Sequence, residues 1–240
     1  MKAHARYSPS GAYGWLRCSR YEGNPTSSRD ADYGTAGHTL AERCLNNRVD
    51  AVAYLGTVIV AGDTEFTVDI AMAAAVQKYL DFVRQQPGLL LVEERLPISH
   101  ITGEADAHGT SDAVRLLPQE IIVIDLKLGA NPRNRISAEN NPQLGIYGLA
   151  AYDHYSFVYD FQSVRLVIVQ PRLDHISESA LSLAELQAFR DSIRPAQSVQ
   201  AGPQQCKWCR HRKVCPERQA FENQQVIDDF SDLSEEELFM

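Results

Sequence analysis

Helix-type and strand-type segments alternate along this chain, and they predict an α/β fold built around a mixed β-sheet. In several segments apolar residues recur at spacings of three and four, which is typical of the buried face of a helix. Between these segments lie short runs rich in Val, Ile and Leu that are bounded by turn residues, which is typical of strands. After a short N-terminal helix, the expected order is two helices, three strands, a helix, a strand and a helix, forming an α/β sandwich.

The first third of the chain predicts helices separated by a loop. The expected bounds are a helix over about 8–21, a loop over 22–33, and helices over about 35–45 and 68–86. Ser8 and Pro9 suit the cap and the first turn of the first helix. The last of these helices ends where Pro87-Gly88 follows.

The rest of the chain predicts the sheet and two more helices. The expected strands are Leu89–Ile98, Gly109–Leu117, Ile121–Lys127 and Val164–Gln170. Asn141-Pro142 is a good helix start, and that helix should reach about Tyr152. Ser182 and Glu185 form a capping box that opens a helix towards Arg194.

Two carboxylates and a lysine stand out on the expected central strands. Asp125 and Lys127 are two residues apart on an almost wholly apolar strand, so they point to the same face. Asp112 lies on the preceding strand and could converge with them. Because an uncompensated buried charge is very costly, these groups require partners. They could form a plain cross-strand ion pair, or they could hold a divalent cation for phosphodiester hydrolysis, a reaction that uses these residue types.

The order of four motifs resembles the RecB-like nucleases of the PD-(D/E)XK superfamily. Asp112 followed by Asp125-Leu126-Lys127 resembles the core motif, although Ser111 stands where the motif often has proline. Upstream, Gly37-His38 resembles the histidine motif. Downstream, Gln143 and Tyr147 match Q-x-x-x-Y and share a helix face because they are four residues apart.

This resemblance implies a Mg²⁺- or Mn²⁺-dependent deoxyribonuclease. His38, Asp112 and Asp125 would hold the metal, and Lys127 would serve catalysis. Gln143 and Tyr147 would face the active site and the substrate. The resemblance is especially close to phage and prophage proteins allied to these nucleases, so the expected role is an exonuclease or end-processing enzyme in phage recombination, replication or repair.

The resemblance also implies a further active-site carboxylate on the strand before Asp112. Glu93 and Glu94 are the candidates and should lie on opposite faces; the resemblance favours Glu93, but strand alternation does not decide between them. Arg133 and Arg135 lie in the loop after the Asp-x-Lys strand, where they could bind DNA phosphates or remain ordinary solvated arginines.

Three of the five cysteines have metal-ligand spacing near the C-terminus. Cys206, Cys209 and Cys215 form C-x2-C-x5-C, and a structural disulfide is not expected in a reducing cytosol. A fourth ligand must come from elsewhere: Cys18 would complete an iron–sulfur set, whereas His211 would complete a local zinc site.

The resemblance supports the first of these alternatives. RecB-like nucleases of the AddB type place one cysteine before the nuclease core and C-x2-C-x5-C after it. By this likeness Cys18 joins the other three around a 4Fe-4S cluster that ties the two ends of the chain together. Cys44 sits on an apolar helix stripe and is expected to be core, while Lys207 and Arg210 belong to a basic segment that could bind DNA.

Charge divides the chain into a near-neutral body and an acidic end. The net charge is −8, and residues 222–240 alone hold seven acids and no base. The expected division is therefore a nuclease domain over 1–221 and an acidic tail over 222–240. Ser234 and Glu237 form a capping box in the tail, which could dock a protein partner or remain solvated.

The composition is that of an ordinary globular protein, 44% apolar and 22% charged. No apolar run approaches the ~18 residues of a membrane span, and the N-terminus lacks the apolar stretch of a signal peptide. We therefore expect a cytoplasmic protein without a membrane partner, in the bacterial host cytosol if a phage encodes it. The rival interpretations are a catalytically inactive nucleic-acid-binding module and a zinc-stabilised interaction protein.

Overall fold

The computed structural model describes residues 5–24 and 27–231, which divide into two compact units. Unit 1 comprises the chain up to Pro9 and Thr26–Ile193. Unit 2 comprises Ser10–Pro25 and the chain from Arg194 onward. Each unit is described by itself.

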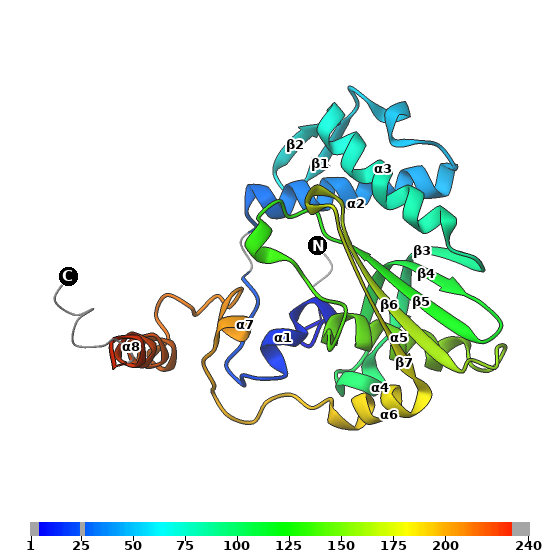
Figure 1. The fold of residues 1–240 in the computed structure, drawn as a ribbon. Helices are drawn as coiled ribbons and strands as arrows, with labels where there is room; N and C mark the ends of the chain where they lie inside the picture. Colours follow the sequence, from blue (N-terminus) through cyan, green and yellow to red (C-terminus); the bar gives the residue numbers. More distant parts are fainter. Residues whose placement is uncertain (1–4, 25–26, 232–240) are drawn as a thin grey trace. The chain divides into compact units, whose positions relative to one another are not determined.

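Unit 1 holds two sheets and most of the helices (Figure 1). Its strands are β1 (Val58–Ala61), β2 (Thr64–Thr67), β3 (Leu89–Pro97), β4 (His108–Leu116), β5 (Glu120–Leu126), β6 (Ser163–Gln170) and β7 (His175–Ser182). Its α-helices are α2 (Arg29–Asn47), α3 (Ile70–Gln85), α4 (Ser99–Thr102), α5 (Pro142–Tyr155) and α6 (Leu183–Ser192). Its 3-10 turns are η2 (Ala51–Tyr54), η3 (Pro132–Asn134) and η4 (Pro171–Leu173). Unit 2 holds α1 (Ala12–Trp15), α7 (Pro203–Cys206) and α8 (Pro216–Ser231), and the 3-10 turn η1 (Pro9–Gly11) spans the first boundary between the units.

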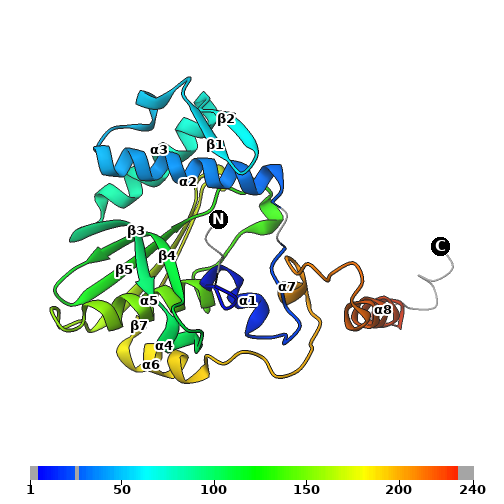
Figure 2. The same ribbon diagram turned by 180° about the vertical axis from the view of Figure 1, so that it is seen from behind.

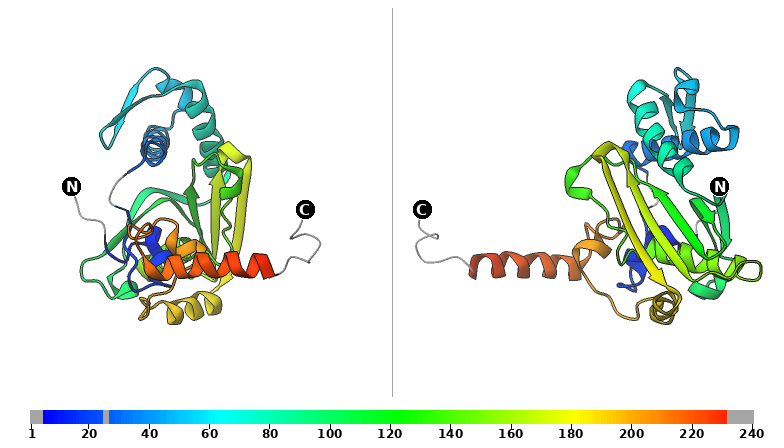
Figure 3. Two further views of the ribbon diagram at one scale, coloured as in Figure 1. Left: turned by 90° about the vertical axis from the view of Figure 1, so that its left-hand side faces the viewer. Right: turned by 45° about the vertical axis from the view of Figure 1, so that its right-hand side comes forward.

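The main sheet has five strands in the order β3-β4-β5-β6-β7. All neighbours are antiparallel except β5 and β6, which run parallel and are joined through α5. A parallel pair requires such a crossover, and the crossover leaves from the carboxyl end of β5. Figure 3 shows the long antiparallel pair β6 and β7 in yellow-green at one edge of the sheet.

Helices lie on both sides of this sheet, as the α/β sandwich predicts (Figures 1 and 2). The helices α2 and α3 share one core with Ile122, Ile124 and Leu126 of β5. The helix α5 packs against the other side, and α6 in turn packs on α5. Phe189 of α6 lies so close to Gly145 that any larger residue there would displace the ring. Because α5 is covered on all sides, its residues 144–151 are all buried.

The structure confirms the predicted central strands and the local helix signals. Every residue from Ile121 to Leu126 is buried, as expected for a strand covered on both faces. Asn141 caps α5 by accepting the Leu144 N–H, at 3.2 Å. Ser182 and Glu185 form both bonds of the predicted capping box.

Two predicted helix boundaries are wrong. The second helix begins at Arg29 rather than Thr35, because Ser28 accepts the Ala31 N–H and two aspartates in the first turn favour an earlier start. The N-terminal helix ends at Trp15 rather than near Tyr21. The chain leaves the helix because backbone groups after Trp15 bind the C-terminal segment of unit 2 instead. For example, the Ser19 N–H donates to Ser198 O at 2.9 Å.

Several elements carry no assignment in the sequence-based prediction, among them the hairpin β1–β2, the strand β7 and the helix α8. The hairpin β1–β2 turns at Gly62, whose φ of +59° suits glycine. The edge strand β7 alternates regularly between half-buried and exposed residues, but its sequence HISESALS is too polar to signal a strand. The helix α8 includes the first part of the acidic tail. The remainder of that tail, with the capping box of Ser234 and Glu237, lies outside the described residues.

No helix among the described residues combines the length and the apolar character needed to cross a bilayer.

Candidate functional site

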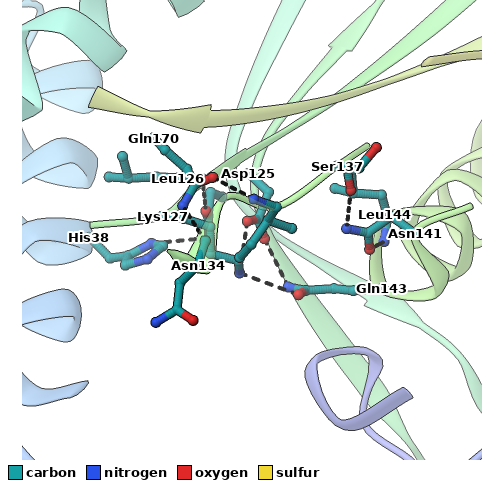
Figure 4. A network of polar contacts seen from close by, with 12 residues as sticks. His38, Asp125, Leu126, Lys127, Asn134, Ser137, Asn141, Gln143, Leu144 and Gln170 are labelled. Atoms are coloured by element: carbon teal, nitrogen blue, oxygen red, sulfur yellow. Dashed lines mark hydrogen bonds and ion pairs between the residues drawn. The ribbon is translucent and has the colours of Figure 1, made fainter. Parts of the chain in front are cut away.

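The carboxyl end of β5 positions the predicted acid and lysine together. Asp125 is 3% exposed, and its Oδ2 atom lies 2.8 Å from Lys127 Nζ. The Lys127 N–H donates to Val169 O at 2.9 Å, which continues the β5–β6 ladder one residue past the strand. The backbone therefore fixes the lysine where the crossover leaves the sheet (Figure 4).

Asp112 lies on β4 immediately beyond the last regular pair with β5. That pair joins Ala113 to Ile124, so the same register places Asp112 opposite Asp125. Beyond this pair the Asp112 carboxylate takes the place of a backbone acceptor of the β4–β5 ladder, because its Oδ2 accepts the Leu126 N–H at 2.7 Å. The second carboxylate oxygen of Asp112, Oδ1, faces a side chain from a helix instead.

The helix α2 supplies His38 to this second oxygen. His38 Nδ1 lies 3.2 Å from Asp112 Oδ1. The preceding residue, Gly37, faces Leu128 just after β5, and a Cβ at Gly37 would collide with the Leu128 Cδ1 methyl. The glycine therefore lets α2 approach closely enough for His38 to reach the carboxylate, which gives the predicted Gly-His pair a steric reason.

The first turn of α5 supplies Gln143, which bridges the acid and the lysine. Gln143 Nε2 donates to Asp125 Oδ1 at 2.8 Å, and Gln143 Oε1 accepts from Lys127 Nζ at 3.3 Å. One turn later Tyr147 is 6% exposed. Burial, followed by the charges of Asp125 and Asp112, raises the pKa of this phenol, so it stays protonated. The Q-x-x-x-Y pair thus faces the acidic cluster.

The strand β3 brings a third carboxylate, from Glu93. The register of β3 with β4 is the same before and after this residue, so Glu93 stands opposite Asp112. Its φ of +50° is a left-handed conformation that is uncommon for a long side chain and that interrupts the ladder. Glu94 is occupied elsewhere, since its Oε1 accepts from the Tyr155 hydroxyl at 2.7 Å. The geometry therefore brings Glu93 to the site, and the interruption explains why alternation could not decide between the two.

Three of these residues could hold a divalent cation. One ligand atom from each of His38, Glu93 and Asp112 lies within 4.8 Å of the other two, and no other such group of three occurs within residues 5–24 and 27–231. Two carboxylates and an imidazole suit Mn²⁺, and the oxygens also suit Mg²⁺. In this geometry Asp125 is engaged by Lys127 and Gln143 instead.

The electrostatics also favour a cation. Burial, followed by the charge of Asp112, raises the pKa of Glu93 to about 7. Burial opposes ionisation of Asp112, but His38, Lys127 and the Leu126 N–H outweigh it and lower the pKa of Asp112. Burial is also the main reason that the pKa of Asp125 is raised. Three carboxyl groups, one buried and two half-buried, thus lie close together, and a bound cation would relieve their mutual repulsion.

Sequence reasoning missed Tyr79 on α3. This residue is 1% exposed, and its hydroxyl has no hydrogen-bond partner among the described residues. Burial raises the pKa of Tyr79 well above its ordinary value, and the charges of Asp112, Asp125 and Glu93 add to the effect. On the sequence Tyr79 is only one member of an apolar helix stripe, so no local signal distinguishes it from core.

The structure does not bring Arg133 and Arg135 into the acidic cluster. Both side chains are exposed, and no ion pair of either occurs in the part of the chain that is described. Their loop is fastened to β6, because Gln170 accepts the Ile136 N–H at 2.7 Å and donates to Asn134 O at 3.1 Å (Figure 4). The arginines therefore stand on an anchored loop and remain available to an external anion.

Unit 2 contains all four cysteines of the predicted cluster. Backbone bonds join its two segments: Ala196 N–H to Trp15 O at 2.9 Å, and Arg210 N–H to Glu22 O at 2.9 Å. The thiols themselves are not gathered into a ligand group among the described residues. Cys206 Sγ accepts the Gly202 N–H at 3.5 Å, and Cys215 Sγ donates to Glu217 Oε2 at 3.2 Å.

The remaining residues of the cysteine segment have ordinary partners. Arg210, predicted to bind DNA, pairs with Glu22 at 2.7 Å, and His211 Nε2 lies 3.6 Å from the same carboxylate. Lys207 is exposed, as a phosphate contact requires. Cys44 is fully buried on α2, and burial raises its pKa to about 11, which keeps the thiol protonated.

Comparison with known proteins places residues 4–238 within a family described as "Protein of unknown function (DUF2800)". A solved structure titled "Crystal structure of SSO0001" is 15% identical and covers 91% of this chain and 89% of its own. Its TM-score is 0.35, a slight likeness.

Proposed function

The chain belongs to the DUF2800 family, and we propose that it is a metal-dependent deoxyribonuclease of the PD-(D/E)XK type that processes DNA ends. One observation carries the proposal: a three-residue ligand group, His38, Glu93 and Asp112, adjoins a lysine held at a strand end by Asp125 and Gln143. A plain ion pair between Asp125 and Lys127 would not require the other three groups.

The donor set fits Mg²⁺ or Mn²⁺, because oxygen ligands dominate it and the carboxyl groups repel one another without a cation. A divalent ion at such a site polarises a phosphodiester and makes water a better nucleophile. Asp112 is preorganised for ligation, since the Leu126 N–H fixes one oxygen and leaves the other facing His38.

Lys127 would act on the reacting phosphate. Its ammonium lies 2.8 Å from Asp125 and 3.3 Å from Gln143, so two partners fix its position before substrate binds. A fixed cation can orient the attacking water and stabilise the negative charge that develops on the phosphate oxygens. Gln143 is then a positioning residue, because it binds the acid and the lysine at once.

DNA is the substrate that the motif order favours. The sequence resemblance covers His38, Asp112, Asp125-x-Lys127 and Gln143-x-x-x-Tyr147. These residues come from α2, β4, the end of β5 with the residue after it, and α5, all in one unit. The exposed Arg133 and Arg135 would hold phosphates of the strand being cut. The role in phage recombination, replication or repair rests on the resemblance.

We also propose that Cys18, Cys206, Cys209 and Cys215 bind a 4Fe-4S cluster. Their donor chemistry fits, since four thiols lie in one compact unit assembled from the two ends of the chain. The isolated bridge between Gly23 and Cys209 brings the N-terminal segment to the cysteine motif. His211 is turned to Glu22, which favours Cys18 over a local zinc site.

The direct test is cleavage of end-labelled linear DNA, single-stranded and double-stranded, by protein purified without oxygen. We expect degradation that requires Mg²⁺ or Mn²⁺ and stops with chelator, and that is lost in Asp125→Asn. Folded protein with its metals bound that leaves every substrate intact would overturn the proposal. Iron and zinc content, measured on the same sample, decides between the cluster and a zinc site.

A further inference from the structure

One tryptophan of unit 2 is exposed although the other is buried. Trp15 is 2% exposed, whereas Trp208, between two of the predicted cluster cysteines, is 64% exposed. A tryptophan is among the most costly side chains to leave in water, so an indole kept at the surface points to a partner.

The backbone around this indole is held in place. Trp208 O accepts the Asn24 N–H at 3.2 Å, and the next residue forms the bridge between Cys209 and Gly23. On the other side, Lys207 O accepts from Arg212 Nη1 at 3.1 Å. The ring is thus exposed on a fastened turn, and such a preorganised group loses little conformational entropy when it binds.

The sequence around Trp208 is cationic, since residues 207–213 contain four lysines and arginines and no acid. Residues 10–24 and 194–225 contain eight arginines and lysines but only three glutamates, an excess of five positive charges, and six further acids follow in residues 226–240. The three glutamates are each paired with an arginine: Glu22 with Arg210, Glu217 with Arg20, and Glu222 with Arg218. The positive excess therefore persists after these pairs form, and it complements a polyanion.

The indole also has a cation over its ring. Lys207 Nζ lies 5.4 Å from the centroid of the Trp208 ring, and Lys213 is exposed in the following turn. A ring with a cation over one face can still present its other face to a flat partner. An aromatic ring flanked by basic residues in this way suits nucleic acid, in which bases and phosphates lie side by side.

We propose that Trp208 stacks on an unpaired base of single-stranded DNA, with Lys207 and Lys213 contacting the neighbouring phosphates. The inference rests on the proposed function for the choice of DNA, but it does not require cleavage. Single strands are favoured because the bases of a duplex already cover one another's faces. The substrate of the proposed nuclease is then an end with a single-stranded portion.

The test uses the full-length protein carrying Asp125→Asn, in chelator, so that DNA is bound and not cut. Oligo-dT and a blunt duplex of equal length are titrated while tryptophan emission is recorded. Because Trp15 is buried, we expect oligo-dT to quench the emission of Trp208. Trp208→Ala should weaken oligo-dT binding about tenfold, the scale of one base–aromatic stack, and should weaken duplex binding less than twofold. Trp208→Phe should retain most of the affinity.

Val214→Ala is the matched control, because Val214 is 73% exposed in the same unit but cannot stack on a base. It should bind oligo-dT normally, and iron content and absorbance must match in all variants. Unchanged oligo-dT affinity in Trp208→Ala, or equal weakening for duplex, would overturn the stacking site. Trp208-dependent oligo-dT binding by a protein that never cleaves DNA would instead leave the stacking site standing and overturn the proposed nuclease.

Discussion

The acidic site of unit 1 and the cysteine segment of unit 2 differ in how completely the polypeptide builds them. In unit 1, sheet register places Glu93, Asp112 and Asp125 at neighbouring positions on three strands, and side chains from two helices reach them. In unit 2, two segments from opposite ends of the chain pack together, but their thiols are not gathered among the residues described.

The difference has a physical basis. A long ladder of backbone hydrogen bonds can hold like charges close together before any ligand arrives. The helices α1 and α7 have only four residues each, and the longer α8 begins after the last cysteine, so the cysteine segments have little regular structure to do the same. Small units commonly depend on a metal or a disulfide for stability. We therefore expect metal loss to stop activity in unit 1 and to destabilise structure in unit 2.

The largest effect should come from Lys127→Ala. Removing a fixed cation from the reacting phosphate should lower cleavage about 10²–10³-fold, because such electrostatic groups act mainly on the transition state. Initial rates on end-labelled DNA measure this, and far-UV circular dichroism should remain unchanged. Lys78→Ala is the control, because its exposed pair with Asp174 lies outside the site. Comparable cleavage rates in the two variants would contradict the assignment of Lys127 to the active site.

Next should come the effect of Cys18→Ser on stability. If Cys18 closes a loop of roughly 190 residues through the cluster, the chain-entropy contribution is about 4–5 kcal/mol. The variant should lose iron and brown colour and should melt well below the wild type by calorimetry. Cys44→Ala should keep its iron, since Cys44 is core. Equal iron content in Cys18→Ser and wild type would show that Cys18 is not a ligand of the cluster.

The parts of the site that could be predicted from sequence are those with local signals. Asp125 and Lys127 follow an uninterrupted apolar run at residues 121–124, and Asn141-Pro142 marks the start of the helix that carries Gln143. The choice between Glu93 and Glu94 could not be predicted, because the left-handed Glu93 breaks the alternation on which such reasoning depends. Tyr79 could not be identified as a site residue from sequence, because its neighbours on α3 are ordinary core residues.

For the fold, too, only the elements with local sequence signals could be predicted. Buried β5 is almost wholly apolar and is predictable from sequence, whereas the edge strand β7 owes its place to pairing with β6 and has few apolar residues. The N-terminal helix was predicted too long because its end depends on contacts with residues near 198, far away in the sequence.

A smaller effect is expected from Gly37→Ala. The added methyl would meet the end of the Leu128 side chain, which can partly move, so the loss should be about 1 kcal/mol of unfolding free energy. Cleavage should fall as well, since α2 would carry His38 away from Asp112. The double variant Gly37→Ala with Leu128→Ala should recover cleavage relative to Gly37→Ala alone. No recovery would mean that the glycine serves another purpose.

The smallest effect should be that of Tyr79→Phe on stability. The buried hydroxyl has no partner among the described residues, so its removal should change the unfolding free energy by less than about 1 kcal/mol. Urea denaturation measures this. A loss of several kcal/mol would show that the hydroxyl is bonded in solution.

Manganese binding tests the central claim most directly. Titration with Mn²⁺ of protein freed of divalent cations but purified without oxygen, followed by calorimetry, should show one site that Asp112→Asn weakens at least about tenfold, because it loses one anionic ligand. The control Asp63→Asn, which alters an exposed residue in the β1–β2 turn, should bind Mn²⁺ as the wild type does. Equal Mn²⁺ affinity in Asp112→Asn and wild type would contradict a metal site at His38, Glu93 and Asp112.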